Sequence, residues 1–263
     1  MKRFLFVAAA SLVVLSACKS LDSIPTSIGL GVVTVSTSDG ATSHMTSPTA
    51  YFVDAVNVSI PNSSVNADTC AEIGYPGTTQ VSPLSQIDAG QPVVFATTLD
   101  TAQLLPTSAD VNGYIFYRLA TNDSIRIVPG TTGRVTIPGT SNGYHAFNFT
   151  FTNADSLKID PILASADSTH DLPITWNPQN GQHASVVLQL EFGPTLAGIN
   201  QQVFCQFTDN GAHSVQASLA NAFRTAPAKR VHAYRFLTTF NNDGTDEVVV
   251  ISTYATDSTV LVP

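Results

Sequence analysis

The feature that most constrains the fold is a strict alternation of side-chain types at residues 144–152. His145, Phe147, Phe149 and Phe151 fall on one side of an extended chain, and mostly polar or small side chains fall on the other. A period of two is typical of an antiparallel strand with one buried face. We therefore expect a strand here, with its aromatic face, His145 included, against a core.

Similar short signals recur along the chain, and only residues 216–224 look helical. Asn-Gly and Asp-Gly pairs supply turns, and charged residues make up only 11% of the chain, which disfavours exposed helices. These observations predict an all-β protein of antiparallel β-sandwich type with little helix, and favour two tandem immunoglobulin-like sandwiches over one. The expected strands are 31–36, 50–60, 92–98, 113–119, 124–128, 133–137, 144–152, 172–176, 184–192, 202–208, 231–240 and 247–254.

The N-terminus carries the most specific motif. Lys2 and Arg3 precede an apolar stretch at 4–14, which is shorter than the roughly 20 residues that span a bilayer as a helix. The stretch ends in Leu-Ser-Ala-Cys at 15–18, and this motif resembles the lipobox of bacterial lipoproteins. The resemblance implies a signal peptide at 1–17, cleavage before Cys18, lipid on its sulfur and an acyl chain such as palmitate on its amine. The alternatives are an ordinary secretory signal and an uncleaved anchor.

The residue after the cysteine is Lys19, and in the sorting rule of enterobacteria-like lipoproteins the absence of Asp there implies the outer membrane. Loss of Lys2 and Arg3 with the leader takes the net charge from −8 to −10, because two positive charges are removed. An acidic body is repelled by anionic lipid headgroups. We therefore expect residues 18–30 to be a flexible tether that holds the body away from the membrane.

Beyond the tether we expect two domains. The period-two pattern lapses after Asn153, and the following stretch is polar and contains Pro161. This predicts a first β-sandwich at 31–155 and a second at 156–263. The net charge of −8 and the absence of a basic cluster larger than Lys229-Arg230 argue against nucleic-acid binding.

Three cysteines are present, and if Cys18 takes lipid, Cys70 and Cys205 remain. In an oxidising compartment this pair could form a disulfide. The alternative is a buried free thiol at Cys205, which shares a strand face with Val203 and Phe207. Both interpretations stay open, because the two cysteines fall in different expected domains.

No catalytic constellation is evident. Residues 139–143 match Gly-x-Ser-x-Gly around Ser141, but a strand rather than a helix follows, so we expect a structural turn instead of a nucleophile elbow. The histidines are dispersed, without zinc-ligand spacing. They are His44, His145, His170, His183, His213 and His232.

One acidic stretch, 241–247, could offer oxygen ligands to Ca²⁺ through Asn241, Asp243 and Asp246. It fails the EF-hand pattern, because Val250 stands where the bidentate Glu belongs. A solvated hairpin loop is the simpler interpretation, so we predict no metal and no cofactor.

Among the aromatic residues, Trp176 alternates with polar Thr175 and is expected in a core. Tyr75, Tyr114 and Tyr117 are better candidates for an exposed binding platform. Carboxylate pairs suited to glycoside cleavage cannot be chosen from the sequence.

A second resemblance rests on short motifs across residues 65–225. Asp88-Ala89-Gly90 precedes a strand, Trp176 ends Ile-Thr-Trp, and Cys205 is followed by Asp-Asn-Gly at 209–211. This pattern resembles one in secreted bacterial β-sandwich proteins that are uncharacterised. It supports the fold and implies no activity.

Together these observations predict a lipoprotein anchored in the outer membrane through Cys18, facing the periplasm or the cell surface, with a non-catalytic binding or structural role. Its partner would be an envelope glycan or protein. The alternative is an extracytoplasmic glycan-active enzyme or a carbohydrate-binding accessory protein.

Overall fold

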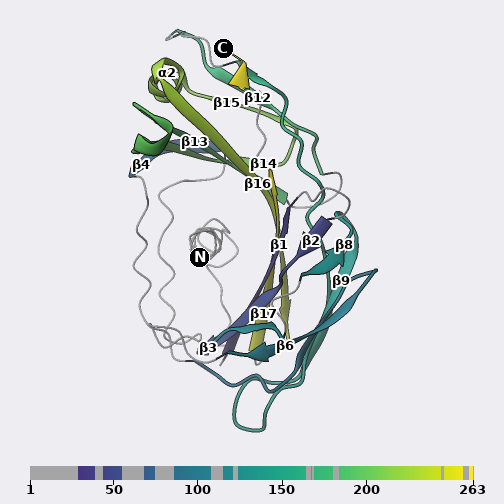
Figure 1. Ribbon diagram of the computed structural model, residues 1–263. Coiled ribbons are helices and arrows are strands. Elements are labelled where there is room, and N and C mark those ends of the chain that lie inside the picture. The colour runs from purple at the N-terminus through teal and green to yellow at the C-terminus, as the bar shows by residue number, and fades with distance from the viewer. Residues whose placement is uncertain are drawn as a thin grey trace. The chain divides into compact units, whose positions relative to one another are not determined.

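Strands dominate the described part of the chain (Figure 1). A computed structural model describes residues 29–38, 44–54, 68–74, 86–107, 115–120, 124–163, 167, 169–179, 184–243, 246–256 and 261–262. The described helical elements are the nine-residue helix α2 (Ala217–Thr225) and the 3-10 turn η3 (Leu196–Gly198). The prediction of an all-β protein with little helix is confirmed, and the lipobox and residues 18–28 of the expected tether lie outside the described residues. The prediction was wrong for the last two tether residues, because Gly29 begins strand β1 and Leu30 is buried in it.

The chain divides into two compact units, and neither is one continuous segment. Unit 1 takes the described residues within Met1–Pro61, Val81–Asp155 and Leu237–Thr253, and unit 2 takes those within Asn62–Gln80, Ser156–Phe236 and Tyr254–Pro263. We expected two consecutive domains that meet after Asp155. One boundary between the units does lie there. However, Asn62–Gln80, which precedes this boundary, belongs to unit 2, and Leu237–Thr253, which follows it, belongs to unit 1. The reason is that strand pairing joins residues that are distant in sequence.

Unit 1 is built mainly from antiparallel strands, its hydrogen-bonded strand order is β10-β9-β5-β6-β7-β3-β1-β17, and β2 joins β1 to β8. Their bounds are β1 (Gly29–Ser38), β2 (His44–Thr46), β3 (Thr49–Asp54), β5 (Val93–Ala96), β6 (Thr101–Pro106), β7 (Tyr117–Leu119), β8 (Ile125–Ile127), β9 (Thr132–Ile137), β10 (Phe147–Thr152) and β17 (Asp246–Thr256).

One hydrophobic core lies inside unit 1. Phe147, Phe149 and Phe151 of β10 enter it, as their alternation predicts, and the ring of Phe151 contacts that of Phe95 of β5 with centroids 5.6 Å apart. The strand begins only at Phe147, so the residues before it do not follow the expected pattern. Tyr144, expected on the polar face, is fully buried, and its hydroxyl donates to the backbone carbonyl of Glu247 at 2.5 Å. His145, expected on the aromatic face, is exposed.

Unit 2 contains the strand order β16-β13-β14-β4, the antiparallel pair β12-β15 and the parallel pair β11-β18. Their bounds are β4 (Thr69–Gly74), β11 (Ile162–Leu163), β12 (Leu172–Thr175), β13 (Ala184–Gly193), β14 (Gln201–Thr208), β15 (Ala212–Val215), β16 (Ala228–Asn242) and β18 (Leu261–Val262). Two strands are divided between the units, because residues 237–242 of β16 belong to unit 1 and residues 254–256 of β17 belong to unit 2.

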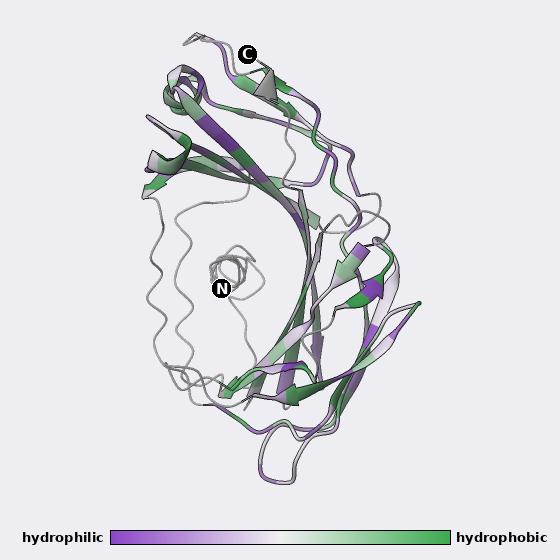
Figure 2. Cartoon of the chain, viewed as in Figure 1, coloured by the Kyte–Doolittle hydropathy of each residue, from purple (hydrophilic) through white to green (hydrophobic). Residues whose placement is uncertain are grey.

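Hydropathy along the long strand β16 is mixed, with hydrophilic and hydrophobic stretches in turn (Figure 2). Helix α2 packs on β13, where the rings of Phe223 and Phe192 meet edge to face with centroids 6.2 Å apart. Trp176 is 4% exposed and stacks on Phe207 of β14, so the predicted core role of the tryptophan is confirmed.

Candidate functional site

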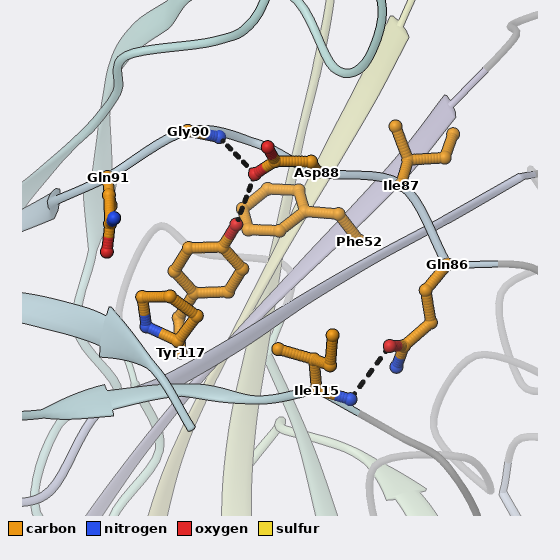
Figure 3. A pocket seen from close by; sticks show the side chains of 9 residues that line it. Phe52, Gln86, Ile87, Asp88, Gly90, Gln91, Ile115 and Tyr117 are labelled. Atoms are coloured by element: carbon orange, nitrogen blue, oxygen red, sulfur yellow. Dashed lines mark hydrogen bonds between the residues drawn. The ribbon is translucent and has the colours of Figure 1, made fainter. Parts of the chain in front are cut away.

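A pocket of about 440 Å³ opens in unit 1 between the segment 86–91 and the strands β3, β6 and β7 (Figure 3). Pockets of this size can hold small molecules. The residues that line it are Phe52, Gln86, Ile87, Asp88, Gly90, Gln91, Pro106, Ile115 and Tyr117.

Backbone hydrogen bonds hold the segment 86–90 on both sides. On one side, Ile87 N–H donates to the Phe52 carbonyl at 3.1 Å. On the other, Gly139 N–H donates to the Ala89 carbonyl and Tyr144 N–H to the Asp88 carbonyl, each at 2.9 Å. The Gly-x-Ser-x-Gly loop therefore serves as a support behind the pocket wall.

Asp88 and Tyr117 form the polar centre of this wall. The Tyr117 hydroxyl donates to Asp88 Oδ1 at 3.1 Å and accepts from Ala89 N–H at the same distance. Gly90 N–H also donates to Asp88 Oδ1, at 2.9 Å. Burial, with the Asp88 carboxylate adding to it, raises the pKa of Tyr117 to about 12, so the phenol stays protonated and keeps donating. Asp88 Oδ2 receives no hydrogen bond from any described residue.

Gln86 is the second polar feature of the lining. Its Oε1 accepts from Ile115 N–H at 2.8 Å, which fixes the orientation of the amide. Its Nε2 is buried and has no hydrogen-bond partner in the described part of the chain. A buried donor without an acceptor is costly, and such groups in native folds call for an explanation.

Only part of this site could be predicted from the sequence. Asp88 was singled out within a motif, but without a role, and Tyr117 was expected to be exposed on a platform. It is instead 4% exposed, because residue 117 of β7 points into the core beside Phe52. Gln86, Gln91 and Ile115 were missed, since they are single residues in segments without a recognisable pattern. Tyr75 and Tyr114 lie outside the described residues.

His145 makes a contact that the sequence did not suggest. Its Nδ1 lies 2.7 Å from Asp246 Oδ2, and its backbone N–H donates to the same oxygen at 2.8 Å. Asp246 is buried, whereas the His145 side chain is 54% exposed. This carboxylate, offered above as a calcium ligand with Asn241 and Asp243, is thus the partner of a histidine. Asp243 Oδ1 accepts from the backbone of Asp246 at 2.9 Å, as in a hairpin turn.

The turn at 139–143 allows a test of the structural interpretation of Ser141. Ser141→Ala is expected to change stability by under about 0.5 kcal/mol, because Ser141 is exposed. Gly143→Val is expected to cost about 1–3 kcal/mol, because a Cβ at residue 143 would lie 2.3 Å from the Asp88 carbonyl oxygen. Gly143 is thus required because of steric contact. A left-handed backbone conformation, which a hairpin turn would suggest at Gly143, is adopted by Gly139 instead, with φ +72°. Chemical denaturation of both variants measures the difference.

A fluorophosphonate probe completes this test. We expect no labelling of Ser141, since a serine nucleophile needs an adjacent general base and donors for the oxyanion. Labelling that disappears in Ser141→Ala would contradict the structural role of the loop.

Other buried carboxylates take part in internal ion pairs. Glu191 of β13 is 2% exposed at its side chain and lies 2.6 Å from Arg230 Nη2, with His232 Nε2 at 3.6 Å. Asp209 pairs with the fully buried Arg235 at 2.7 Å. These pairs neutralise charge within unit 2, which is what buried ions require for stability.

Glu247 of β17 is different, because burial raises the pKa of its carboxyl and no described residue pairs with it. The folded state therefore favours the neutral acid, and stability falls as the pH rises through the folded pKa. Glu247→Gln should raise the melting temperature at pH 7 and give no gain at pH 4. The exposed Glu72→Gln is the control for loss of one negative charge. Thermal unfolding at both pH values checks this, and an equal gain at pH 4 and pH 7 would refute it.

Cys70 and Cys205 form a disulfide within unit 2. They lie directly opposite each other on the neighbouring strands β4 and β14. The sequence left a free thiol open because the two cysteines seemed to belong to different domains. The segment that carries Cys70 is in fact part of unit 2, which brings the pair together.

The described residues contain no group of three or more His, Cys, Asp or Glu that could hold a metal ion. Within the same residues, no helix is both long and apolar enough to cross a membrane.

Comparison with protein-family models, with curated proteins and with solved structures gave no match for this chain.

Proposed function

We propose that the chain is a lipoprotein of the bacterial cell envelope, held at the outer membrane by lipid on Cys18, and that its β-rich body binds a ligand without catalysis. The pocket around Asp88 and Tyr117 is the observation that carries the binding role. The motif Leu-Ser-Ala-Cys at 15–18, behind a short apolar stretch, supports the anchor. No cofactor is part of the proposal.

A non-catalytic role is supported by the chemistry of the pocket. Cleavage of a glycoside generally needs two carboxylic acids on either side of the bond. Asp88 is the one acid among the described residues that line the pocket, and its Oδ1 already accepts two hydrogen bonds. The alternative of a glycan-active enzyme therefore has less support than that of a glycan-binding protein.

The anchor gives a direct prediction. Cys18→Ser should move the protein from the membrane fraction to the aqueous fraction, or leave unprocessed precursor, because only the thiol can carry the thioether-linked lipid. Cell fractionation and labelling with an alkyne analogue of palmitate measure this. The double variant Cys70→Ser/Cys205→Ser is the matched control, since it removes the other two cysteines and should keep its label. A native Cys18 without acyl mass in mass spectrometry would contradict the proposal.

A further inference from the structure

We propose that two copies of this chain associate through the open edge of strand β10, in an antiparallel pairing centred on Thr150. Strand β10 (Phe147–Thr152) is the last strand of the unit 1 order, and β9 is its only partner among the described strands. Its other edge therefore offers backbone groups to a further strand. This inference assigns an interaction surface, and it is independent of the pocket and of the anchor.

The register of the β9–β10 ladder shows which backbone groups point to the open edge. Asn153 N–H donates to the Thr131 carbonyl at 2.8 Å, one position beyond the last pair of a ladder that runs without a break. In an antiparallel ladder, hydrogen-bonded and non-hydrogen-bonded pairs alternate along the strand. The three phenylalanines of β10 therefore bond to β9, whereas the N–H and C=O groups of Asn148, Thr150 and Thr152 point away from it.

This edge has none of the features that usually keep strand edges from pairing with another chain. Natural edge strands are protected by charged side chains, prolines or bulges. Strand β10 reads Phe-Asn-Phe-Thr-Phe-Thr, without a charge or a proline, and its pairing with β9 contains no bulge. The side chains of Asn148 and Thr150 are exposed, so solvent reaches the edge. Uncharged segments of this length with strong strand propensity readily pair with their own copies.

The outward groups are symmetric about Thr150, which favours a second copy as the occupant of the edge. A two-fold axis at Thr150 places this residue opposite its own copy, and places Asn148 opposite the partner's Thr152. All outward-pointing residues of both strands are then paired, and each pair can exchange two backbone hydrogen bonds. The side chains that meet are uncharged, so they do not repel each other, and Thr–Thr contacts across strands are favourable. The two-fold axis closes the assembly as a dimer.

The core side of the edge gives a second observation. Phe147, Phe149 and Phe151 keep 7%, 4% and 3% of their surface exposed, whereas Val135 of β9 and Phe95 of β5, one and two strands further in, are fully buried. The aromatic core therefore reaches the surface at β10. In the dimer, Phe149 of one copy lies opposite Phe151 of the other, which continues the aromatic row across the interface and removes its residual exposure.

Two substitutions at Thr150 test the pairing without disturbing the ladder to β9. Thr150→Lys puts two like charges directly opposite each other at the two-fold axis, and the residue is exposed, so the single chain tolerates it. Thr150→Pro removes an N–H that points outward, a place where an edge strand accepts proline. Gln103→Lys is the matched control, because it makes the same change of charge at an exposed residue of the inner strand β6.

The experiment is sedimentation equilibrium of the full chain in a density-matched detergent, at protein concentrations up to about 0.1 mM. We expect the wild-type chain and Gln103→Lys to show the same monomer–dimer equilibrium. Thr150→Lys and Thr150→Pro should each raise the dissociation constant about tenfold or more, since like charges in contact and a lost backbone donor both oppose pairing. Two chains that merely share a micelle would not distinguish Thr150→Lys from Gln103→Lys.

Hydrogen exchange of the wild-type chain locates the interface even where a variant fails to fold. The amides of Asn148, Thr150 and Thr152 should exchange at least tenfold more slowly in the dimer than in the monomer. A chain that stays monomeric over the whole concentration range would overturn the inference and leave a strand of another protein as the occupant of the edge. A dimer with unprotected edge amides, or one that both Thr150 variants retain, would also overturn it. None of these results depends on a ligand or on acyl mass at Cys18, so they test the dimer separately from the proposed function.

Discussion

Replacing Arg235 with methionine is expected to lower the free energy of unfolding by about 3–5 kcal/mol, the typical loss when one member of a buried ion pair is removed. The Arg235 side chain is fully buried and that of Asp209 is 1% exposed. Methionine fills a similar volume but leaves the Asp209 carboxylate as an uncompensated charge away from water. Urea denaturation of the variant and the wild-type chain gives the difference.

The network around this pair explains the size of the expected effect. Arg235 Nε donates to Asp209 Oδ2 at 2.7 Å, and Nη1 donates to the Ser156 carbonyl at 2.6 Å. Its Nη2 donates to the Asn177 carbonyl and to Asp209 Oδ1. The Trp176 indole donates to that same Oδ1 at 2.7 Å. One guanidinium therefore ties three separated chain segments together, and its loss takes a donor from two part-buried carbonyls and leaves the buried Asp209 carboxylate without a counter-charge.

The exposed ion pair between Arg126 and Asp100, at 2.9 Å, provides a matched control. Arg126→Met makes the same chemical change at the surface, where ion pairs contribute little, and should leave the unfolding midpoint nearly unchanged. Trp176 is the single tryptophan, so its fluorescence reports on the network directly. Equal midpoints for Arg235→Met and the wild-type chain would show that the pair does not stabilise unit 2.

Removal of the disulfide has the next largest expected effect. The double variant Cys70→Ser/Cys205→Ser should lose about 2–5 kcal/mol, because the bond closes a loop with a sequence separation of 135 and restricts the unfolded chain. Strand β4 would then be held to β14 by its backbone ladder and side-chain contacts alone. Thermal unfolding with and without a reductant measures the loss.

Cys18→Ser is the control, because it replaces the third cysteine but leaves the disulfide in place. It should unfold at the wild-type temperature, and reductant should destabilise it as much as it destabilises the wild-type chain. If reductant has no effect on the wild-type midpoint, the disulfide does not contribute to stability.

Much of the secondary structure could be predicted from the sequence, because local alternation reports directly on which side chains meet a core. The strand at 144–152 and the helix at 216–224 correspond to β10 and α2, each within a few residues. The prediction failed where a tertiary contact outweighed the alternation. Tyr144 turns inward because its hydroxyl finds the Glu247 carbonyl, 103 positions along the chain.

The candidate site could be predicted only in outline. Asp88 lies in a short motif that the sequence made visible, but the partners that give it a role come from β7 and from the loop at 139–144. A lone glutamine such as Gln86 carries no local signal, because its importance lies in the absence of an acceptor around Nε2. That absence is a property of the packed structure.

By itself, the sequence determined the fold class, since the period of two and the scarcity of charged residues act over neighbouring positions. It also carries the lipobox-like motif at 15–18, which a peptidase would read as a linear segment. Only the tertiary structure decided that Cys70 faces Cys205, that Arg235 neutralises Asp209 and that the Tyr117 hydroxyl donates to Asp88. These pairings depend on strand order and register. Both are set by contacts between distant segments, which no local pattern specifies.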